Sequence, residues 1–215
     1  TAQALGRDPY RAPNDFPEDI QELLLYLGDD NDTQVHAYPG EHTNVPVYLL
    51  GSSLYSAELA AKLGLPYAFA SHFASAHLEN ALHLYRQNFQ PSQYLSEPYT
   101  IACINGIAAN SDAEAKRMLT SLHQYFLSVI TGDQKKLQPP IDSMKDVWTM
   151  QQREAVLDML RFTLVGDPET VEKQLNAFMK MTDVDEIMIT SHIYDQEQRY
   201  RSYEIIKQIV EKHKK

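Results

Sequence analysis

The strongest constraint on the fold is a repeated pairing of a short apolar run with a longer amphipathic pattern. The apolar runs at 45–50, 67–70, 99–109 and 186–190 are typical of strands. In the first of them the apolar residues do not alternate with polar ones, which favours a parallel strand covered on both faces. Helical patterns follow them at 54–63, 76–89, 111–130 and 196–212. Four such units predict an α/β fold with right-handed βα connections around a parallel sheet, the strands being neighbours in that order.

Capping residues and helix-breaking residues indicate where the helices begin and end. Asp15 is predicted to cap a first helix that stops at Gly28, and Ser111 opens a helix with a second capping-box pattern. A helical pattern at 150–162 precedes Asp167, which with Pro168 predicts the start of another helix running to about residue 181. Residues 132–149 between these helices are read as a surface connector.

Composition excludes several classes of function. The 215 residues carry 29 acidic against 19 basic side chains, and a net charge of -10 disfavours nucleic acid or an anionic membrane as a partner. No apolar run approaches the roughly 20 residues that span a bilayer. The single cysteine, Cys103, excludes an intramolecular disulfide and indicates a reducing compartment, so we expect a cytoplasmic protein.

Two blocks of sequence carry a family resemblance. They read VPVYLLGSSLYSAELAAKLGLPYAFA at 45–70, and LVGDPETV at 164–171 followed by VDEIMITSH at 184–192. In this order and on these strand–helix boundaries they resemble the bacterial-luciferase-like flavin-dependent monooxygenases, and the resemblance runs from about residue 15 to the end. It implies a (β/α)8 TIM barrel, incomplete here, with about strands five to eight. Residues 1–215 would then be the C-terminal part of one barrel domain, from a truncated longer protein or one completed by a partner segment.

The resemblance also implies a function. Members of the family react reduced flavin, usually FMN, with oxygen and a small organic substrate, so we expect an oxidoreductase of this kind. A deazaflavin-dependent hydride-transfer enzyme is the closest alternative among enzymes. Two alternatives that are not enzymes are a flavin-binding paralogue without catalysis and a fragment that binds no ligand. A flavin reductase as partner and a homodimer of the complete protein follow from the same resemblance.

The best candidate for cofactor binding is the segment from Gly51 to Ser56. A buried strand that ends in Gly-Ser-Ser and feeds a helix directs backbone N–H groups and the positive end of the helix dipole at one spot, which favours an anion. The resemblance assigns the flavin phosphate to this turn, held by Gly51, Ser52, Ser53 and Ser56 with Tyr55 flanking. The alternative is that Ser53 only caps the helix.

Two histidines are the candidate catalytic residues. His72 and His192 each follow a predicted strand, at what would be the active-site edge of a barrel, where a His can act as general acid or base or donate to a flavin or substrate oxygen. The alternative for each is a ring satisfied by backbone groups. No metal site is predicted, because no cysteine or carboxylate cluster accompanies the histidines. Tyr125, Phe126 and Trp148 could line a substrate pocket, but helical spacing favours core packing for the first two, and Trp148 is left undecided. Cys103 is also expected to pack in the core. Surface or loop positions are expected for five histidines, namely His36, His42, His83, His123 and His213.

Overall fold

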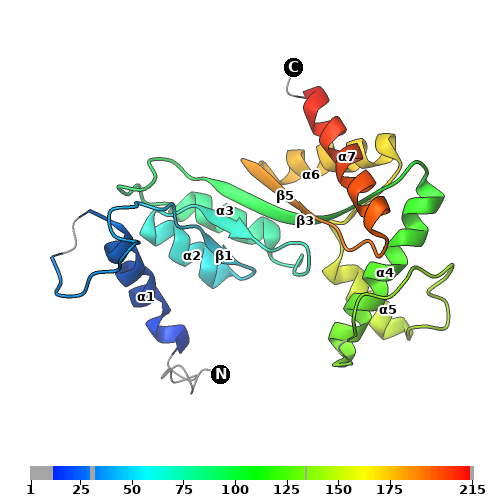
Figure 1. Cartoon of the computed structure of the whole chain (residues 1–215), viewed down its shortest axis with the longest axis horizontal. Helices are drawn as coiled ribbons and strands as arrows, with labels where there is room; N and C mark the ends of the chain where they lie inside the picture. Colours follow the sequence, from blue (N-terminus) through cyan, green and yellow to red (C-terminus); the bar gives the residue numbers. More distant parts are fainter. Residues whose placement is uncertain (1–11, 30–31, 134, 214–215) are drawn as a thin grey trace. The chain divides into compact units, whose positions relative to one another are not determined.

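The computed structural model of the chain describes residues 12–29, 32–133 and 135–213. Two compact units can be distinguished, Thr1–Tyr48 and Leu49–Lys215, and each is described by itself. Figure 1 shows the chain coloured from blue at its start to red at its end.

The first unit consists of the helix α1 (Ala12–Leu27) and the segment that follows it. The prediction that Asp15 caps this helix is wrong, because α1 begins at Ala12 and Asp15 lies in its first turn. A carboxylate there still stabilises the positive end of the helix. The helix stops at Leu27 as predicted, and its last carbonyl accepts a hydrogen bond from the backbone N–H of Asn44 at 2.9 Å.

The second unit alternates strands with helices (Figure 1). Its elements are β1 (Leu49–Gly51), α2 (Leu54–Leu63), β2 (Tyr67–Phe69), α3 (Leu78–Asn88), β3 (Thr100–Ala108), α4 (Asp112–Thr131), α5 (Met150–Met159), β4 (Leu164–Gly166), α6 (Pro168–Thr182), β5 (Glu186–Thr190) and α7 (Gln196–His213).

The strands of this unit form one parallel sheet. β1 pairs with β2 and β2 with β3, and β3 pairs with β5 along its first half and with β4 along its last residues. The predicted α/β class and the four parallel neighbours are therefore confirmed. β4 is an addition that the sequence did not reveal, because three residues are too few for a periodic signal.

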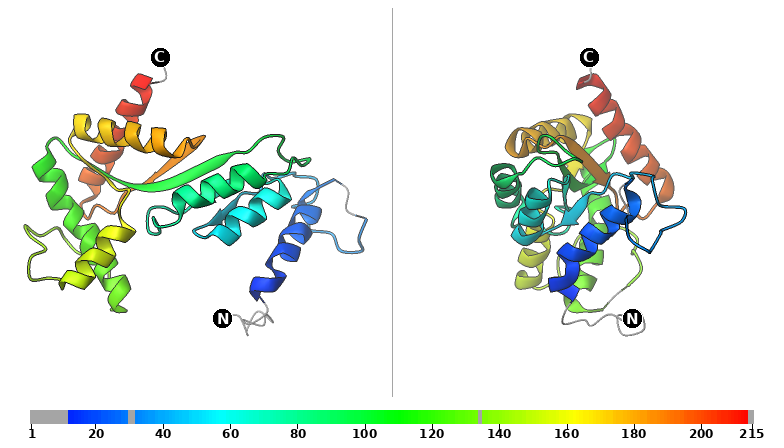
Figure 2. Two further views of the ribbon diagram at one scale, coloured as in Figure 1. Left: turned by 180° about the vertical axis from the view of Figure 1, so that it is seen from behind. Right: turned by 90° about the vertical axis from the view of Figure 1, so that its left-hand side faces the viewer.

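Helices pack against one face of the sheet. Figure 2 shows α2 and α3 beside β1 and β2, and α6 and α7 beside the other end of β3. α7 approaches β3 closely at Gly106, where an added Cβ would lie 2.6 Å from Ile206 Cδ1 and 2.8 Å from Ile189 Cγ2. Any side chain at Gly106 would therefore push α7 away from the sheet.

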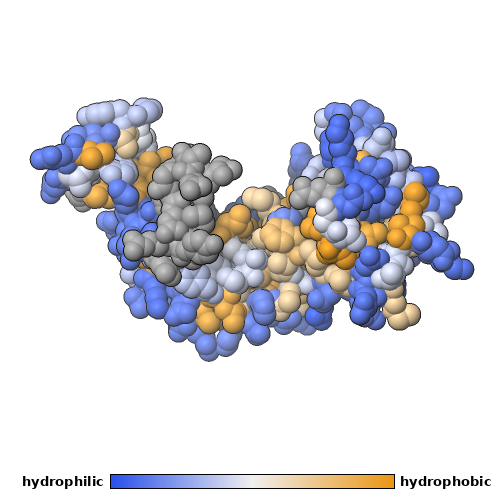
Figure 3. Space-filling view, turned by 90° about the horizontal axis from the view of Figure 1, so that it is seen from below, coloured by the Kyte–Doolittle hydropathy of each residue, from blue (hydrophilic) through white to orange (hydrophobic). Residues whose placement is uncertain are grey.

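The opposite face of the sheet is more open than the sequence predicted. Leu50 of β1 is 66% exposed and Met188 of β5 is 55% exposed, while Cys103 between them is half-buried. The expectation that the first strand is covered on both faces is thus wrong for β1 within the described residues, because the side chain of Leu50 is exposed. Hydrophobic side chains that reach the surface appear orange in Figure 3.

His123 departs from its expected surface position. It lies on α4 with its ring 5.1 Å from that of Trp148, and burial, together with the charge of Arg153, lowers its pKa to about 4. Trp148 itself, which the sequence left undecided, packs against the core cluster of α4 and α5. Residues 132–149, apart from residue 134, form no helix or strand in the structure. No helix among the described residues is both long and apolar enough to cross a membrane.

Candidate active site

The turn between β1 and α2 is built around Ser53. Ser53 has an extended backbone and caps α2, its hydroxyl oxygen accepting a hydrogen bond from the backbone N–H of Ser56 at 3.3 Å. The hydroxyl of Ser56 donates in turn to the Ser53 carbonyl at 2.8 Å. The proton of Ser56 is therefore used inside the turn. Ser53 accepts its capping bond, and its O–H can donate to Ser56 Oγ, 3.4 Å away, or to a ligand.

Gly51 allows the first turn of α2 to approach β1 closely. A Cβ built on Gly51 would lie 2.1 Å from Ser56 Oγ and 2.3 Å from Ser56 Cβ, so only glycine fits at this point. The Ser56 hydroxyl also lies 3.1 Å from that of Tyr67, whose pKa burial raises to about 12. Tyr67 is thus a neutral phenol that donates to the Ser53 carbonyl at 3.3 Å and holds the turn in place.

Side-chain bonds to β3 fix the segment that follows β2. The hydroxyl of Ser71 donates to the backbone carbonyl of Cys103 at 2.7 Å. Two residues further along β3, Nδ2 of Asn105 donates to the backbone carbonyl of His72 at 2.6 Å. His72 is therefore held beside the second half of β3.

The segment that follows β5 is held on β3 in a similar way. The hydroxyl of Ser191 donates to the carbonyl of Gly106 at 2.7 Å. The ring of His192 stacks on Tyr125 of α4 with centroids 5.4 Å apart and an interplanar angle of 24°. Phe126 meets the same ring edge-on at 6.4 Å. Phe126 is buried in the core as expected, and the half-buried Tyr125 packs against the same core and forms a wall beside His192.

Both histidines have a lowered pKa. Burial lowers the pKa of His72. For His192 burial is again the largest cause, followed by the neighbouring His72 and then Arg199. The two rings are close enough that a positive charge on His72 disfavours protonation of His192. With their pKa values lowered, both rings are neutral at pH 7.

Three polar atoms in this neighbourhood are buried without a hydrogen-bond partner among the described residues. They are Nδ1 of His72, Nδ1 of His192 and Oδ1 of Asn105. The alternative that backbone groups satisfy the two rings therefore does not hold for their Nδ1 atoms. Buried polar atoms are normally paired, so their clustering favours a ligand that pairs with them. The described residues contain no group of three or more His, Cys, Asp or Glu side chains able to hold a metal ion.

All of these groups lie at the carboxyl edge of the sheet. Gly51 ends β1, His72 follows β2 and His192 follows β5, and the three strands run parallel through β3. The structure thus brings the predicted turn and the two predicted histidines to one edge. It adds Asn105, for which no role was predicted, and Tyr125, for which core packing was favoured over a place in a pocket wall.

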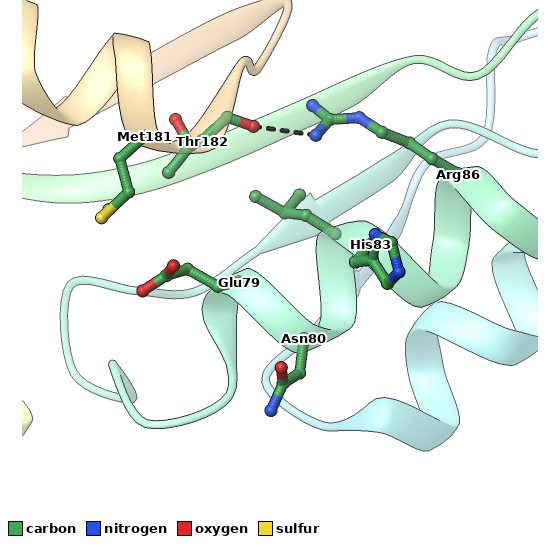
Figure 4. Close-up of a pocket in the computed structure, with 7 residues that line it drawn as sticks. Glu79, Asn80, His83, Arg86, Met181 and Thr182 are labelled. Atoms are coloured by element: carbon green, nitrogen blue, oxygen red, sulfur yellow. Dashed lines mark hydrogen bonds between the residues drawn. The ribbon is translucent and has the colours of Figure 1, made fainter.

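A second groove lies between α3 and the end of α6. Figure 4 shows its walls, which come from α3 and the end of α6. The guanidinium of Arg86 donates hydrogen bonds there to the carbonyl of Thr182 at 2.8 Å, to Thr100 Oγ1 at 3.2 Å and to the carbonyl of Asp183. These bonds tie α3 to the end of α6 and to the start of β3, so Arg86 has a structural role.

Comparison with known proteins adds a family. The family model described as luciferase-like monooxygenase matches residues 22–185. A luciferase-like monooxygenase of Escherichia coli (strain K12) is 43% identical over 212 residues, which cover 98% of this chain and 63% of that protein. The chain therefore spans less than two thirds of the length of this relative.

Solved structures share the fold. Apo-MsnO8 superimposes with a TM-score of 0.76 at 28% identity, over 92% of this chain and 61% of that one. The oxygenating constituent of 3,6-diketocamphane monooxygenase from Pseudomonas putida, in complex with FMN, gives a TM-score of 0.50 at 19% identity, over 84% and 52% of the two chains. A coenzyme F420-dependent tetrahydromethanopterin reductase from Methanopyrus kandleri gives 0.53 at 14% identity, over 92% and 62%. The expected TIM-barrel fold, present here in part, is confirmed.

Proposed function

The chain belongs to the luciferase-like monooxygenase family. We propose that it is part of a monooxygenase that uses reduced FMN and oxygen on a small organic substrate. The observation that carries the proposal is the gathering of the α2 N-terminus and the rings of His72 and His192 at one edge of a parallel sheet. In barrels of this architecture that edge is where active sites lie. We further propose that residues 1–215 are the C-terminal part of one barrel domain, with 132–149 as a connector inside it.

The FMN phosphate would bind at the turn between β1 and α2. The first N–H groups of a helix have no partner within the helix, and the helix dipole favours negative charge at that end. In this proposal the half-buried Ser52 and the exposed Ser53 add hydroxyl donors, and Tyr55, which is 53% exposed, flanks them. Ser56 shapes the turn through its bond to the Ser53 carbonyl and its contact with Gly51.

The two histidines would handle protons beside the cofactor ring. When bound, reduced flavin supplies the electrons that activate oxygen, and the protein supplies position and electrostatics. His72 and His192 are neutral at pH 7 because burial lowers their pKa values, so each can accept a proton from the substrate or return one. The stacked ring of Tyr125 restricts the orientation of His192 and keeps water from that side.

A deazaflavin-dependent hydride-transfer enzyme is the second candidate. It is favoured by the F420-dependent reductase that shares the fold, and the phosphate-binding turn suits either cofactor. Oxygen consumption separates the two, because it accompanies turnover with reduced FMN and a flavin reductase but not hydride transfer from a deazaflavin. A flavin-binding paralogue would bind FMN without turnover in both assays. A homodimer of the complete protein remains part of the proposal.

The Ser53→Ala substitution tests the phosphate site. A hydrogen bond to a charged group is worth about 1.5–3 kcal/mol, so the dissociation constant of FMN should rise roughly 10-fold to 100-fold. Riboflavin lacks the phosphate and should bind the wild type more weakly, with little change on substitution. Titration of both ligands by flavin fluorescence gives the two ratios.

The control for this experiment is a substitution that removes the N-terminal cap of a different helix. Thr149 caps α5 by accepting a hydrogen bond from the Gln152 N–H at 3.2 Å, and α5 does not follow a strand of the sheet. Thr149→Ala should leave both dissociation constants unchanged. If Ser53→Ala shifts FMN and riboflavin in parallel, Ser53 is only a cap and the proposed phosphate site is wrong.

A further inference from the structure

Asn105 lies on β3 with an amide oxygen that has no partner. The residue is 1% exposed, and Oδ1 accepts no hydrogen bond from any described residue. Its orientation is determined, because Nδ2 lies 2.6 Å from the carbonyl oxygen of His72 and a flipped amide would set two oxygens against each other. Oδ1 is therefore a fixed acceptor at the carboxyl edge of the sheet.

Packing alone does not account for this oxygen. An apolar residue would suit a dry core position better, since a buried carbonyl without a donor is costly. The neighbouring residues of β3 are apolar or small, as in the run from Ile101 to Ala108. A ligand that brings an N–H to Asn105 would satisfy Oδ1 and explain an amide at this place.

Two further unpaired atoms lie in the same neighbourhood. Nδ1 of His72 and Nδ1 of His192 are buried without a partner, and the backbone carbonyl of His72 already accepts the bond from Asn105. A neutral imidazole carries one N–H, so each ring can present Nδ1–H as a donor. The neighbourhood can thus offer two donors and one acceptor to a single ligand.

The imide edge of a flavin has the complementary pattern. Its pyrimidine ring presents an N–H between two carbonyl groups, and deazaflavins carry the same edge. We propose that Asn105 is a cofactor-binding residue whose Oδ1 accepts the imide N–H, while the Nδ1–H groups of His72 and His192 donate to the imide carbonyls. This inference rests on the proposed function and names the part of the cofactor that these residues would recognise.

The assignment also fixes the chemistry of the two histidines. A ring that donates from Nδ1 is in the tautomer whose Nε2 carries the lone pair. Nε2 is then the atom that accepts a proton, so binding the cofactor prepares each ring as a base.

The experiment compares riboflavin with riboflavin methylated at the imide nitrogen. The two ligands share everything except the N–H, so the wild-type protein should bind riboflavin at least about 10-fold more tightly. In Asn105→Ala the acceptor is gone and there is room for the methyl group. The ratio of the two dissociation constants should fall to about one, mainly through weaker binding of riboflavin.

Ser121→Ala is the matched control. The hydroxyl of Ser121 on α4 is also buried without a partner, and its removal should leave the ratio unchanged. Equal affinity of the wild type for the two ligands would overturn the role of Asn105 and leave flavin binding intact. Absence of binding by FMN and by both riboflavins would instead overturn the proposed function. A wild-type ratio near one overturns the role of Asn105 even if Asn105→Ala fails to fold.

Discussion

Replacing His192 or His72 by glutamine is expected to lower the turnover number with reduced FMN and oxygen by about 100-fold to 10,000-fold, the range attributed to general acid–base catalysis. Glutamine keeps a hydrogen-bond donor of similar size, so FMN should still bind, but it cannot take up or release a proton near neutral pH. Oxygen consumption in the presence of a flavin reductase measures the turnover number. Fluorescence titration measures FMN binding separately.

The pH profile distinguishes a proton-transfer role from a structural one. Burial lowers the pKa of both rings, and the protonated form cannot accept a proton. Wild-type kcat/KM should therefore fall as the pH is lowered below about 6.5, the ordinary pKa of His. The low activity that remains in a glutamine variant should not show this fall at acidic pH. His83→Gln is the control, because it changes an exposed histidine in the groove between α3 and α6. Wild-type turnover in both glutamine variants would show that neither ring transfers the proton.

Acidification from pH 7 to pH 4 should destabilise the wild-type protein by about 3 kcal/mol more than His123→Gln. His123 has a pKa of about 4 in the folded protein and about 6.5 when unfolded, and each unit of difference corresponds to about 1.4 kcal/mol. Because the folded pKa is the lower one, the unfolded state takes up the proton first. The stabilisation is complete above pH 6.5 and is lost as the pH falls towards 4.

Urea unfolding at a series of pH values between 7 and 4 measures this difference. Arg153→Gln is the control, because burial is the larger cause of the lowered pKa and Arg153 the smaller one. That variant should keep most of the wild-type pH dependence. If His123→Gln loses stability with pH as steeply as the wild type, the imidazole of His123 is already protonated or solvated in the folded protein.

The elements with strong local signals were predictable from the sequence. α2 runs from Leu54 to Leu63 between Ser53 and Gly64, and β5 covers Glu186–Thr190, both as predicted. A capping serine, a glycine stop and an uninterrupted apolar run are each determined by neighbouring residues. β4 and the open face of the sheet were missed, because three residues give no period and burial depends on what packs on the other side.

The candidate site was predicted in part for the same reason. Strand ends placed Gly51, His72 and His192 at one edge without knowledge of any distance. Asn105 left one signal, a polar side chain inside an apolar strand, which the sequence alone could not distinguish from a surface position. Helical spacing could not show that Tyr125 meets His192, since that contact joins residues far apart in the chain.

Hydrogen exchange with and without FMN tests the central claim, that the cofactor binds at the carboxyl edge of the sheet. We expect slower exchange of backbone amides at 51–56, 71–73 and 191–193 when FMN is present, with little change in peptides from α3 or the end of α6. Peptide-resolved mass spectrometry resolves these segments. Protection confined to the groove around Glu79, His83 and Met181, or no protection at the three segments under saturating FMN, would contradict it.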